Sequence, residues 1–346
     1  MSDLRINNIT DRTGGSGPII AGVSTVTGTG AFIVPVGPTE NRGGRGRGLF
    51  SGGYRQGGGD FNVIEMIEIA TTGNATDFGD LTTERRGTGG VCASSTRSVM
   101  IGGRDSPVNE PAIDYVIFSS SGGASTFGEL AGGVSNSGQC SNATRGICYS
   151  GSRGNPSPAN SSQISYITLA STGDASDFGE ATSAYVTPGG AASPTRGLFA
   201  GGYNPAELNS IDYVTIASQG NGLDFGDLTI TVRRIAGSSN STRAIWAGGN
   251  RYPSAPQGTA DIDYSTIATL SNAIDFGTLT SSNAGGPAAC ASATRSVINR
   301  TSTSSASNVM EHVTIMSTGN GIDFGDLTTD TLWGRGGSSD SHGGLG

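Results

Sequence analysis

The stretch between Ser210 and Gly249 decides the fold of this chain. It contains Ile-Asp-Tyr-Val-Thr-Ile (211–216), Leu-Asp-Phe-Gly-Asp-Leu-Thr (223–229) and Ser-Thr-Arg-Ala-Ile-Trp-Ala-Gly-Gly (241–249). Short runs of β-branched and aromatic residues, bounded by glycine, asparagine and serine, are typical of β-strands joined by turns. All three segments recur in the same order through most of the chain, so we interpret them as parts of one repeating β-unit.

The copies are clearest when they are aligned on the arginine that opens the third segment. Successive arginines are 47 to 52 residues apart. They are Arg47, Arg97, Arg145, Arg196, Arg243 and Arg295. The phenylalanine of the second segment keeps the same spacing, at Phe78, Phe127, Phe178, Phe225, Phe276 and Phe324. A period of about 50 residues is that of a β-propeller blade, so six phased copies predict six blades.

Composition agrees with an array of short strands and restricts the class of partner. The chain has 346 residues, of which 58 are glycine and 34% are hydrophobic, and the glycines are in phase with the apolar runs. The net charge is −8, all 20 basic residues are arginine, and no basic stripe of the kind that follows a phosphate backbone is present. We therefore expect no nucleic-acid partner. The polar N-terminus resembles no signal peptide and no apolar run could span a bilayer, so we expect no membrane insertion.

Cysteine and histidine are too few and too scattered for a metal centre. Cys92, Cys140 and Cys290 each stand five residues before a repeated arginine, which places them on equivalent strands of different blades. We expect these three, and Cys148, to be buried reduced thiols rather than disulfides or metal ligands. The two histidines are His312 and His342. The sequence therefore predicts no cofactor and no metal.

The two ends of the chain differ from the repeat. Residues 1–41 carry two short apolar runs, at 19–23 and 31–36, which have too few partners to bury a core alone. We expect this segment to anchor or oligomerise the protein, and residues 42–346 to form the propeller. A loose tail is the alternative for residues 1–41.

Residues 330–341 predict how the propeller closes. They align with residues 230–241, which contain the first strand of the fifth copy, but no second strand follows them. The first copy, in turn, begins near its second strand. We expect the C-terminal strand to complete the first blade, which removes two sheet edges. In the fifth copy the expected strands are 231–239 and 243–247, preceded by 211–217 and a strand around Asp224-Phe225-Gly226.

The order of these landmarks resembles the kelch repeat. An apolar strand ends in Gly-Gly, a strand with an aromatic residue follows, and Leu-Thr and arginine come after the next turn. The phenylalanine of the Asp-Phe-Gly box stands where kelch repeats usually have tryptophan. The resemblance covers residues 42–346 and implies an all-β fold, a six-bladed kelch-like propeller of four-stranded blades.

A residue present in every blade usually serves the blade itself. We therefore expect the six repeated arginines to be structural and to pair with repeated carboxylates. The candidate partners are Glu65, Asp114, Asp212, Asp263 and Glu311, or Asp77, Asp177, Asp224, Asp275 and Asp323. No serine-hydrolase elbow and no sialidase-type Asp-box turn occurs, so we expect no catalytic residues and no enzyme. Abundant carboxylates leave a glycosidase open as an alternative.

The loops that connect the second and third strands differ most among the copies. They emerge on the same face as the connections between blades, because successive strands alternate in direction. Their polar and aromatic residues suit a carbohydrate or protein surface, and drift on a solvated face is the alternative. The candidate binding residues are Tyr54, Arg55, Arg104, Asn109, Arg153, Tyr203, Asn204, Arg251, Tyr252 and Arg300.

Residues 4–14 and the Asp-Phe-Gly-Asp-Leu-Thr repeat together resemble structural proteins of tailed bacteriophages, notably cyanophages. The resemblance implies a tail or fibre-associated virion protein on the external surface of the particle. It implies that residues 1–41 dock on other virion proteins and that the propeller contacts a host-surface glycan or protein. We expect a symmetric homo-oligomer; fibres usually have threefold symmetry, but the sequence does not fix the number of copies. A glycan-processing enzyme and a kelch-like scaffold for a protein partner are the alternative functions.

Overall fold

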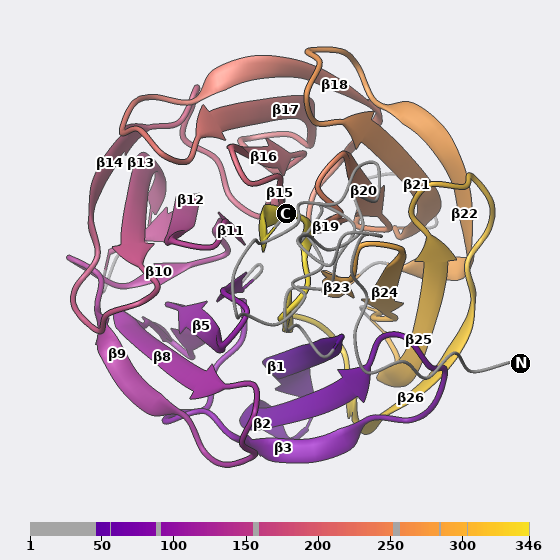
Figure 1. Ribbon diagram of the computed structural model, residues 1–346, viewed down its shortest axis with the longest axis horizontal. Helices are drawn as coiled ribbons and strands as arrows, with labels where there is room; N and C mark the ends of the chain where they lie inside the picture. The colour runs from indigo at the N-terminus through magenta and orange to yellow at the C-terminus, as the bar shows by residue number, and fades with distance from the viewer. Residues whose placement is uncertain are drawn as a thin grey trace, which may run out of the picture. The chain divides into compact units, whose positions relative to one another are not determined.

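The computed structural model describes residues 46–55, 57–87, 91–154, 159–251, 257–283, 285–302 and 304–345. They belong to the second of the two units into which the chain divides, Gly43–Gly346. Six antiparallel sheets of four or five described strands are arranged around a central axis (Figure 1), and two further short strands form a hairpin of their own. The all-β, six-bladed propeller expected from the repeat is confirmed. The expectations for residues 1–41 and for Tyr252 lie outside the described residues.

Each blade has four main strands, here called A to D from the channel outward. Blade 1 is β27 (Gly336–Ser339), β1 (Arg47–Arg55), β2 (Gly59–Glu68) and β3 (Thr76–Asp80). Blade 2 is β4 (Cys92–Ala93), β5 (Arg97–Ile101), β8 (Ala112–Ile117) and β9 (Ser125–Glu129). Blade 3 is β11 (Gly138–Ser141), β12 (Arg145–Arg153), β13 (Ala159–Thr168) and β14 (Ser176–Glu180), with β10 (Val134–Ser135) also paired to β12.

The second half of the ring repeats the pattern. Blade 4 is β15 (Gly189–Ala192), β16 (Arg196–Ala200), β17 (Leu208–Thr215) and β18 (Leu223–Val232). Blade 5 is β19 (Ala236–Ser239), β20 (Arg243–Ala247), β21 (Thr259–Thr266) and β22 (Ile274–Asn283). Blade 6 is β23 (Ala289–Ala291), β24 (Arg295–Asn299), β25 (Ser307–Thr314) and β26 (Ile322–Thr331). A hairpin of β6 (Arg104–Asp105) and β7 (Val108–Asn109) extends blade 2, and the 3-10 turn η1 (Gly343–Leu345) follows β27.

The ring is closed by the C-terminal strand, as predicted. Strand β27 pairs with β1 in the register Gly48↔Ser339 to Ser51↔Gly336. The Tyr54 N–H continues this pairing by donating to the Trp333 carbonyl at 2.9 Å. The first blade is therefore built from both ends of the described chain.

Strand boundaries differ from the prediction at two places in the fourth and fifth copies. The strand expected at 231–239 begins only at Ala236, because the preceding strand β18 continues as far as Val232. The strand expected at 211–217 runs from Leu208 to Thr215. Both differences arise because polar residues such as Asn209 and Thr229 extend the strands beyond their apolar centres.

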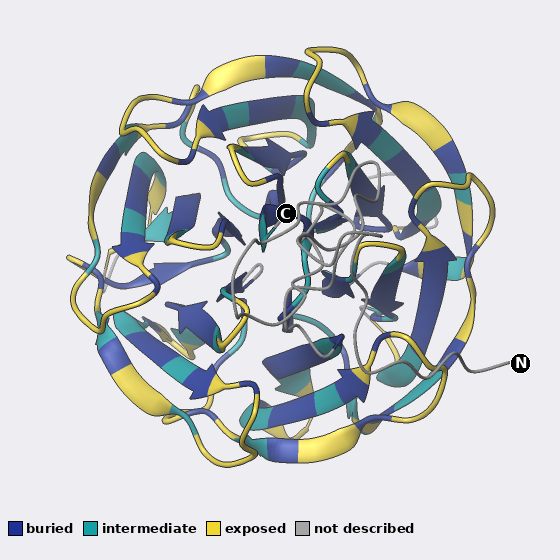
Figure 2. Cartoon of the chain, viewed as in Figure 1, coloured by how far each residue is buried: buried dark blue, intermediate teal, exposed yellow. Residues whose placement is uncertain are grey.

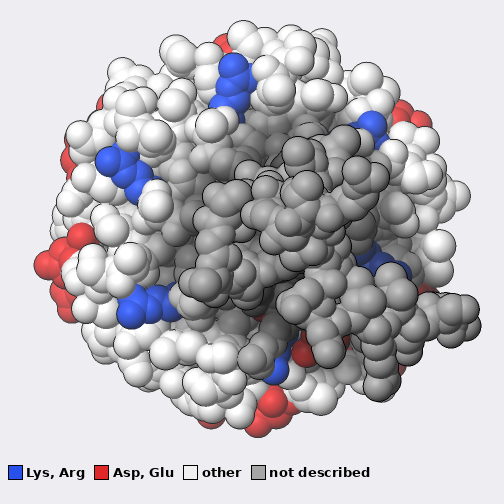
Figure 3. Space-filling view, viewed as in Figure 1, with Lys and Arg blue, Asp and Glu red and all other residues white. Residues whose placement is uncertain are grey.

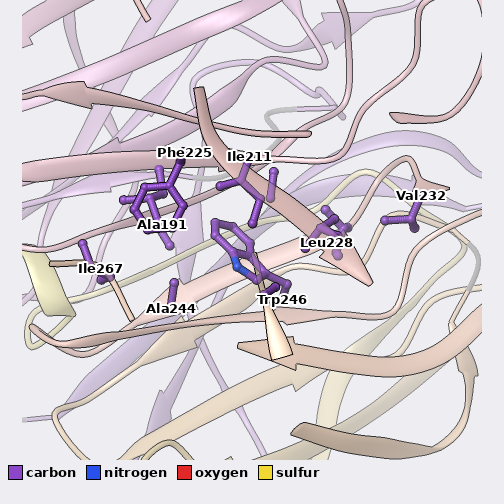
Figure 4. Close-up of a cluster of buried hydrophobic side chains, with 12 residues drawn as sticks. Ala191, Ile211, Phe225, Leu228, Val232, Ala244, Trp246 and Ile267 are labelled. Carbon is purple, nitrogen blue, oxygen red and sulfur yellow. The ribbon is translucent and has the colours of Figure 1, made fainter. Parts of the chain in front are cut away.

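Apolar side chains are buried between blades rather than around a single centre. The described residues form six hydrophobic clusters, and each joins the facing sheets of two successive blades. Between blades 4 and 5, Trp246 packs among Ile211, Phe225, Leu228 and Ile267 (Figure 4). Burial is greatest on the inner strands, and exposed residues concentrate on the outer strands and turns (Figure 2). Each blade therefore depends on both neighbours for its core.

The Asp-Phe-Gly box locks each outer strand to the next blade. Phe78 is 3% exposed, and its carbonyl accepts a hydrogen bond at 2.7 Å from the Gly122 N–H in the C–D turn of blade 2. At Gly79 a Cβ would collide with the Gly122 carbonyl oxygen. Its φ of 150° is also unfavourable for any residue with a side chain. The box therefore repeats because every blade makes this close approach.

Candidate binding face

The six repeated arginines hold the blades together. In each, a guanidinium Nη1 donates to a backbone carbonyl at the end of strand C or in the C–D turn of the next blade; Arg97, for example, reaches the Leu169 carbonyl at 3.2 Å. The other acceptors are the carbonyls of Phe118, Ile216, Ile267, Ile315 and Ile69. Basic side chains recur at regular intervals around one face of the disk (Figure 3). The predicted pairing of these arginines with the repeated carboxylates is wrong, because the repeated acceptors are carbonyl oxygens. Arg47 also forms an ion pair at 3.5 Å, with Glu68, which is not one of the predicted carboxylates.

Aromatic residues on strand C support the same arginines. The guanidinium carbons of Arg97, Arg145, Arg196 and Arg243 lie 4.1 to 5.0 Å from the centroids of tyrosine rings in their own blades. Such cation–π contacts position the planar guanidinium toward the neighbouring blade. These arginines therefore serve the fold.

The repeated carboxylates of strand C bind the threonine that follows the Asp-Phe-Gly box in the preceding blade. Asp114 accepts from the Thr82 hydroxyl at 2.7 Å, and Asp263 accepts from the Thr229 hydroxyl at 2.8 Å. Asp212 accepts from Tyr149 and Tyr185, each at 2.8 Å, and from Thr182 at 2.6 Å. Burial raises the pKa of Asp212 and of Asp263. These carboxylates lie within the interfaces between blades, so their hydrogen bonds join neighbouring blades.

The opposite face carries the B–C loops and the connections between blades, and we call it the loop face. Backbone bridges join the two kinds of loop: Tyr54↔Trp333, Arg86↔Arg104, Val186↔Tyr203 and Arg233↔Asn250. The prediction that both emerge on one face is confirmed. The bridges place variable B–C residues next to residues at the mouth of the channel.

Six equivalent residues surround this mouth in a left-handed conformation. They are Gly87, Asn136, Thr187, Arg234, Gly286 and Gly334, with φ between 56° and 86°. Backbone hydrogen bonds run around the ring: the Asn136, Thr187 and Arg234 N–H groups each donate to the preceding member at 2.7 to 3.0 Å. Glycine adopts this conformation freely, whereas other residues lose about 1–2 kcal/mol. Thr187 and Arg234 are therefore strained positions in a rigid ring.

Two aromatic residues and two arginines gather beside the ring, and we call Tyr54, Arg86, Arg234 and Trp333 the channel-mouth cluster. The Tyr54 and Trp333 ring centroids are 5.2 Å apart. The Arg86 guanidinium carbon lies 4.5 Å from the Tyr54 centroid and 4.3 Å from that of Trp333. The Arg234 guanidinium carbon lies 5.0 Å from the Trp333 centroid. All four residues are half-buried.

The charges in and around the cluster do not balance. Arg86 pairs with Asp60 at 2.9 Å, and Arg233 pairs with Glu207 at 3.4 Å. No carboxylate of the described residues forms an ion pair with Arg234. Burial, followed by the charges of Arg233 and Arg86, lowers the pKa of Arg234 to about 10. Arg234 is still charged at neutral pH, so the cluster carries an excess positive charge.

A cavity of about 40 Å³ opens beside the cluster. It is lined by the left-handed ring together with Trp333, Pro188 and Pro287. The volume has room for about three water molecules. A second cavity, of about 50 Å³, lies in the channel between the A strands and His342. Burial lowers the pKa of His342 to about 4, and its neutral ring accepts from the Gly344 N–H through Nδ1 at 3.1 Å.

The structure gathers some of the predicted binding residues and separates others. Tyr54 belongs to the channel-mouth cluster, and Tyr203 lies beside it, with its ring centroid 4.9 Å from the Arg233 guanidinium carbon. Arg55 forms an exposed ion pair with Asp330. Arg104, Arg251 and Arg300 lie on separate loops of the same face, half-buried.

Three predicted binding residues form hydrogen bonds with neighbouring strands or connections instead. Asn109 was expected to be exposed but is only 1% exposed, because its side chain donates to the Ser152 carbonyl and accepts from Ser135. Arg153 donates to the Gln163 carbonyl and the Ser165 hydroxyl, each at 3.2 Å. Asn204 donates to the Ala184 carbonyl. Their polar side chains stabilise the loops that carry them.

No family model matches the chain, and no curated protein matches it. Among the described residues, no helix is long and apolar enough to cross a membrane.

Sequence reasoning missed Arg86, Arg233, Arg234 and Trp333. A signal was present, because Arg85-Arg86 and Arg233-Arg234 are the two arginine doublets of the chain and Trp333 aligns with Arg233.

Proposed function

We propose that the protein is a structural component of a tailed-phage virion whose propeller binds a host-surface glycan through the loop face. The channel-mouth cluster is the observation that carries this proposal. Tyrosine, tryptophan and arginine are the residues most often found at the centres of binding surfaces. The resemblance of residues 4–14 and of the Asp-Phe-Gly-Asp-Leu-Thr repeat to phage proteins supports the virion location.

The rigidity of the cluster favours binding over a merely solvated surface. Tyr54 and Trp333 come from opposite ends of the described chain and are joined by the strand pairing that closes the ring. Arg86 is held by Asp60 and by both aromatic rings. Side chains fixed in advance lose little conformational entropy when a ligand binds. The cluster therefore suits a sugar, which its guanidinium groups and the aromatic rings that hold them would contact together.

Glycan binding by the full-length protein tests this function. We expect Tyr54→Ala to weaken binding to host surface polysaccharide at least tenfold, because the substitution removes an aromatic contact at the centre of the face. Leu270→Ser, at an exposed position in the C–D turn of blade 5 on the opposite face, is the control and should bind normally. Glycan arrays and calorimetry measure the binding, and mass spectrometry of purified particles tests the virion location.

Two results would contradict the proposal. Shortened glycan products would favour the glycan-processing enzyme. Absence of the protein from purified particles would favour a kelch-like scaffold with a protein partner.

The outer rim supports the proposed homo-oligomer. Leu223, Ile274 and Ile322 open the outermost strands of blades 4, 5 and 6 and are 55%, 57% and 62% exposed. The equivalent residues of blades 1 to 3 are Thr76, Ser125 and Ser176. The outermost strands of blades 4 to 6 (β18, β22 and β26) are ten residues long, whereas those of blades 1 to 3 (β3, β9 and β14) are five residues long. Long edge strands that carry an exposed apolar residue can pair with another chain, and a second copy offers the same edges.

Serine at these three positions should therefore weaken self-association. We expect the triple variant Leu223→Ser, Ile274→Ser, Ile322→Ser to shift the full-length protein to a lower oligomeric state in sedimentation velocity. Thr187→Gly, on the loop face, should leave the oligomeric state unchanged. Identical sedimentation of the triple variant and the parent would contradict the proposed interface.

A further inference from the structure

Arg234 occupies a position that favours glycine. Three of its five ring equivalents, Gly87, Gly286 and Gly334, are glycine, whereas Arg234 has a φ of 57°. Strained backbone conformations persist where surrounding structure enforces them, and they concentrate at binding and catalytic sites. The ring supplies that enforcement, because the Arg234 N–H donates to the Thr187 carbonyl at 3.0 Å. The strain fixes the direction in which the side chain leaves the backbone.

The Arg234 side chain runs along the channel mouth. Its Cβ, Cγ and Cδ atoms pass Gly286, where an added Cβ would come within 3.4 to 3.7 Å of them. Its guanidinium reaches Trp333, which lies at the junction of blades 6 and 1. The side chain therefore extends from the junction of blades 4 and 5 past the next junction to the channel-mouth cluster, beside the cavity that Arg234 helps to line.

The Arg234 guanidinium lies in the channel-mouth cluster without an acidic partner among the described residues. Of the three neighbouring arginines, Arg86 forms an ion pair with Asp60 and Arg233 forms one with Glu207. No described carboxylate pairs with Arg234. A planar guanidinium can bind a carboxylate or phosphate through two parallel hydrogen bonds, and such pairs are strong where water is partly excluded.

We propose that Arg234 binds an oxyanion, a carboxylate or phosphate group of an acidic surface polysaccharide, while Tyr54 and Trp333 contact the adjoining sugar. This inference rests on the proposed glycan-binding function and specifies its ligand as anionic. The oxyanion would occupy the mouth of the cavity and supply the charge that the described carboxylates leave unbalanced. A neutral polysaccharide would lack this contact.

Substitution of Arg234 tests the proposal in the full-length protein. Arg234→Gly should lower affinity for an acidic oligosaccharide at least tenfold, yet raise the melting temperature by about 2 °C, because backbone strain and charge repulsion are both relieved. Ser150→Gly is the control, since Ser150 has a similar φ of 53° but lies outside the ring and the cavity, so the substitution relieves similar strain without removing charge. It should raise the melting temperature and keep the affinity. Arg234→Lys, which keeps the charge but not the two-pronged geometry, should bind with intermediate affinity.

Three probes identify the source of the oxyanion in calorimetric titrations. They are a glucuronic-acid oligosaccharide, a glycerol-phosphate polymer and inorganic phosphate, with a neutral oligosaccharide of matched length as the reference. Preference for the uronic acid or for the polymer assigns a carboxylate or a phosphodiester, and binding of inorganic phosphate alone would overturn a polysaccharide ligand. Equal binding of Arg234→Gly and parent to an acidic probe would overturn the role of Arg234. Equal binding of neutral and acidic probes would overturn the oxyanion but leave glycan binding intact, whereas no binding of any probe would overturn both.

Discussion

A chain that ends at Asp330 is expected to lose its cooperative unfolding transition. The deletion removes β27, so that β1 loses its inner neighbour and the pairing from Gly48↔Ser339 to Ser51↔Gly336. It also removes Arg335, whose side chain is fully buried and paired with Glu65. An unpaired buried carboxylate alone costs about 3–5 kcal/mol, a large part of the 5–15 kcal/mol that stabilises a typical domain. Calorimetry of the full chain and of the truncated chain would measure the loss.

A shorter truncation distinguishes the effect of losing the strand that closes the ring from the effect of losing only the last residues of the chain. Removal of residues 342–346 keeps β27 and its pairing but deletes the His342 side chain, which hydrogen-bonds the Ala93 carbonyl at 2.8 Å. We expect this variant to unfold in one transition at a moderately lower temperature. If the chain ending at Asp330 melts with the enthalpy and midpoint of the full chain, the C-terminal strand does not hold the ring closed.

The blade count and the closure could be predicted because they depend on periodicity alone. Six phased arginines fix the number of copies, and an unpaired first strand at the C-terminus leaves one economical place for it. The partners of those arginines could not be predicted in the same way. Arg97 and Asp114 recur with the same period, so the sequence does not show whether they meet each other or atoms of the neighbouring blade. The structure pairs Arg97 with the Leu169 carbonyl and Asp114 with Thr82.

The binding face was predicted only in part, for a related reason. Loop variability points to the B–C loops and so to Tyr54 and Tyr203. It does not point to Arg234 or Trp333, because the connections between blades look regular in sequence and meet at the channel mouth only once the ring has closed. Polarity alone was also misleading at Asn109, whose side chain is buried by hydrogen bonds within its own face.

Removal of one buried carboxylate between blades 1 and 2 is the second large effect that we expect. The Asp114 side chain is 1% exposed and pairs with Arg85, which is fully buried. Arg85 also donates to the Gly102 and Ala112 carbonyls at 3.2 and 3.1 Å. Asp114→Ala would leave the guanidinium buried without a counter-charge, so we expect a loss of about 3–5 kcal/mol in the free energy of unfolding, measured by urea denaturation.

The double variant Arg85→Met, Asp114→Leu is the matched control for Asp114→Ala, because it removes both charges and fills the space with apolar groups. We expect it to recover most of the lost stability, since a buried ion pair adds little over well-packed hydrophobic residues. Blade 3 already lacks this carboxylate: it has Ser165 at the position of Asp114, and the preceding connection has Ala131 at the position of Thr82. The carboxylate and its threonine partner are therefore absent together in this interface, as expected if each of the two is retained for the hydrogen bond with the other. If the double variant is no more stable than Asp114→Ala, then removal of both charges does not restore stability. That result would show that this interface depends on the ion pair itself and not only on the absence of an unpaired charge.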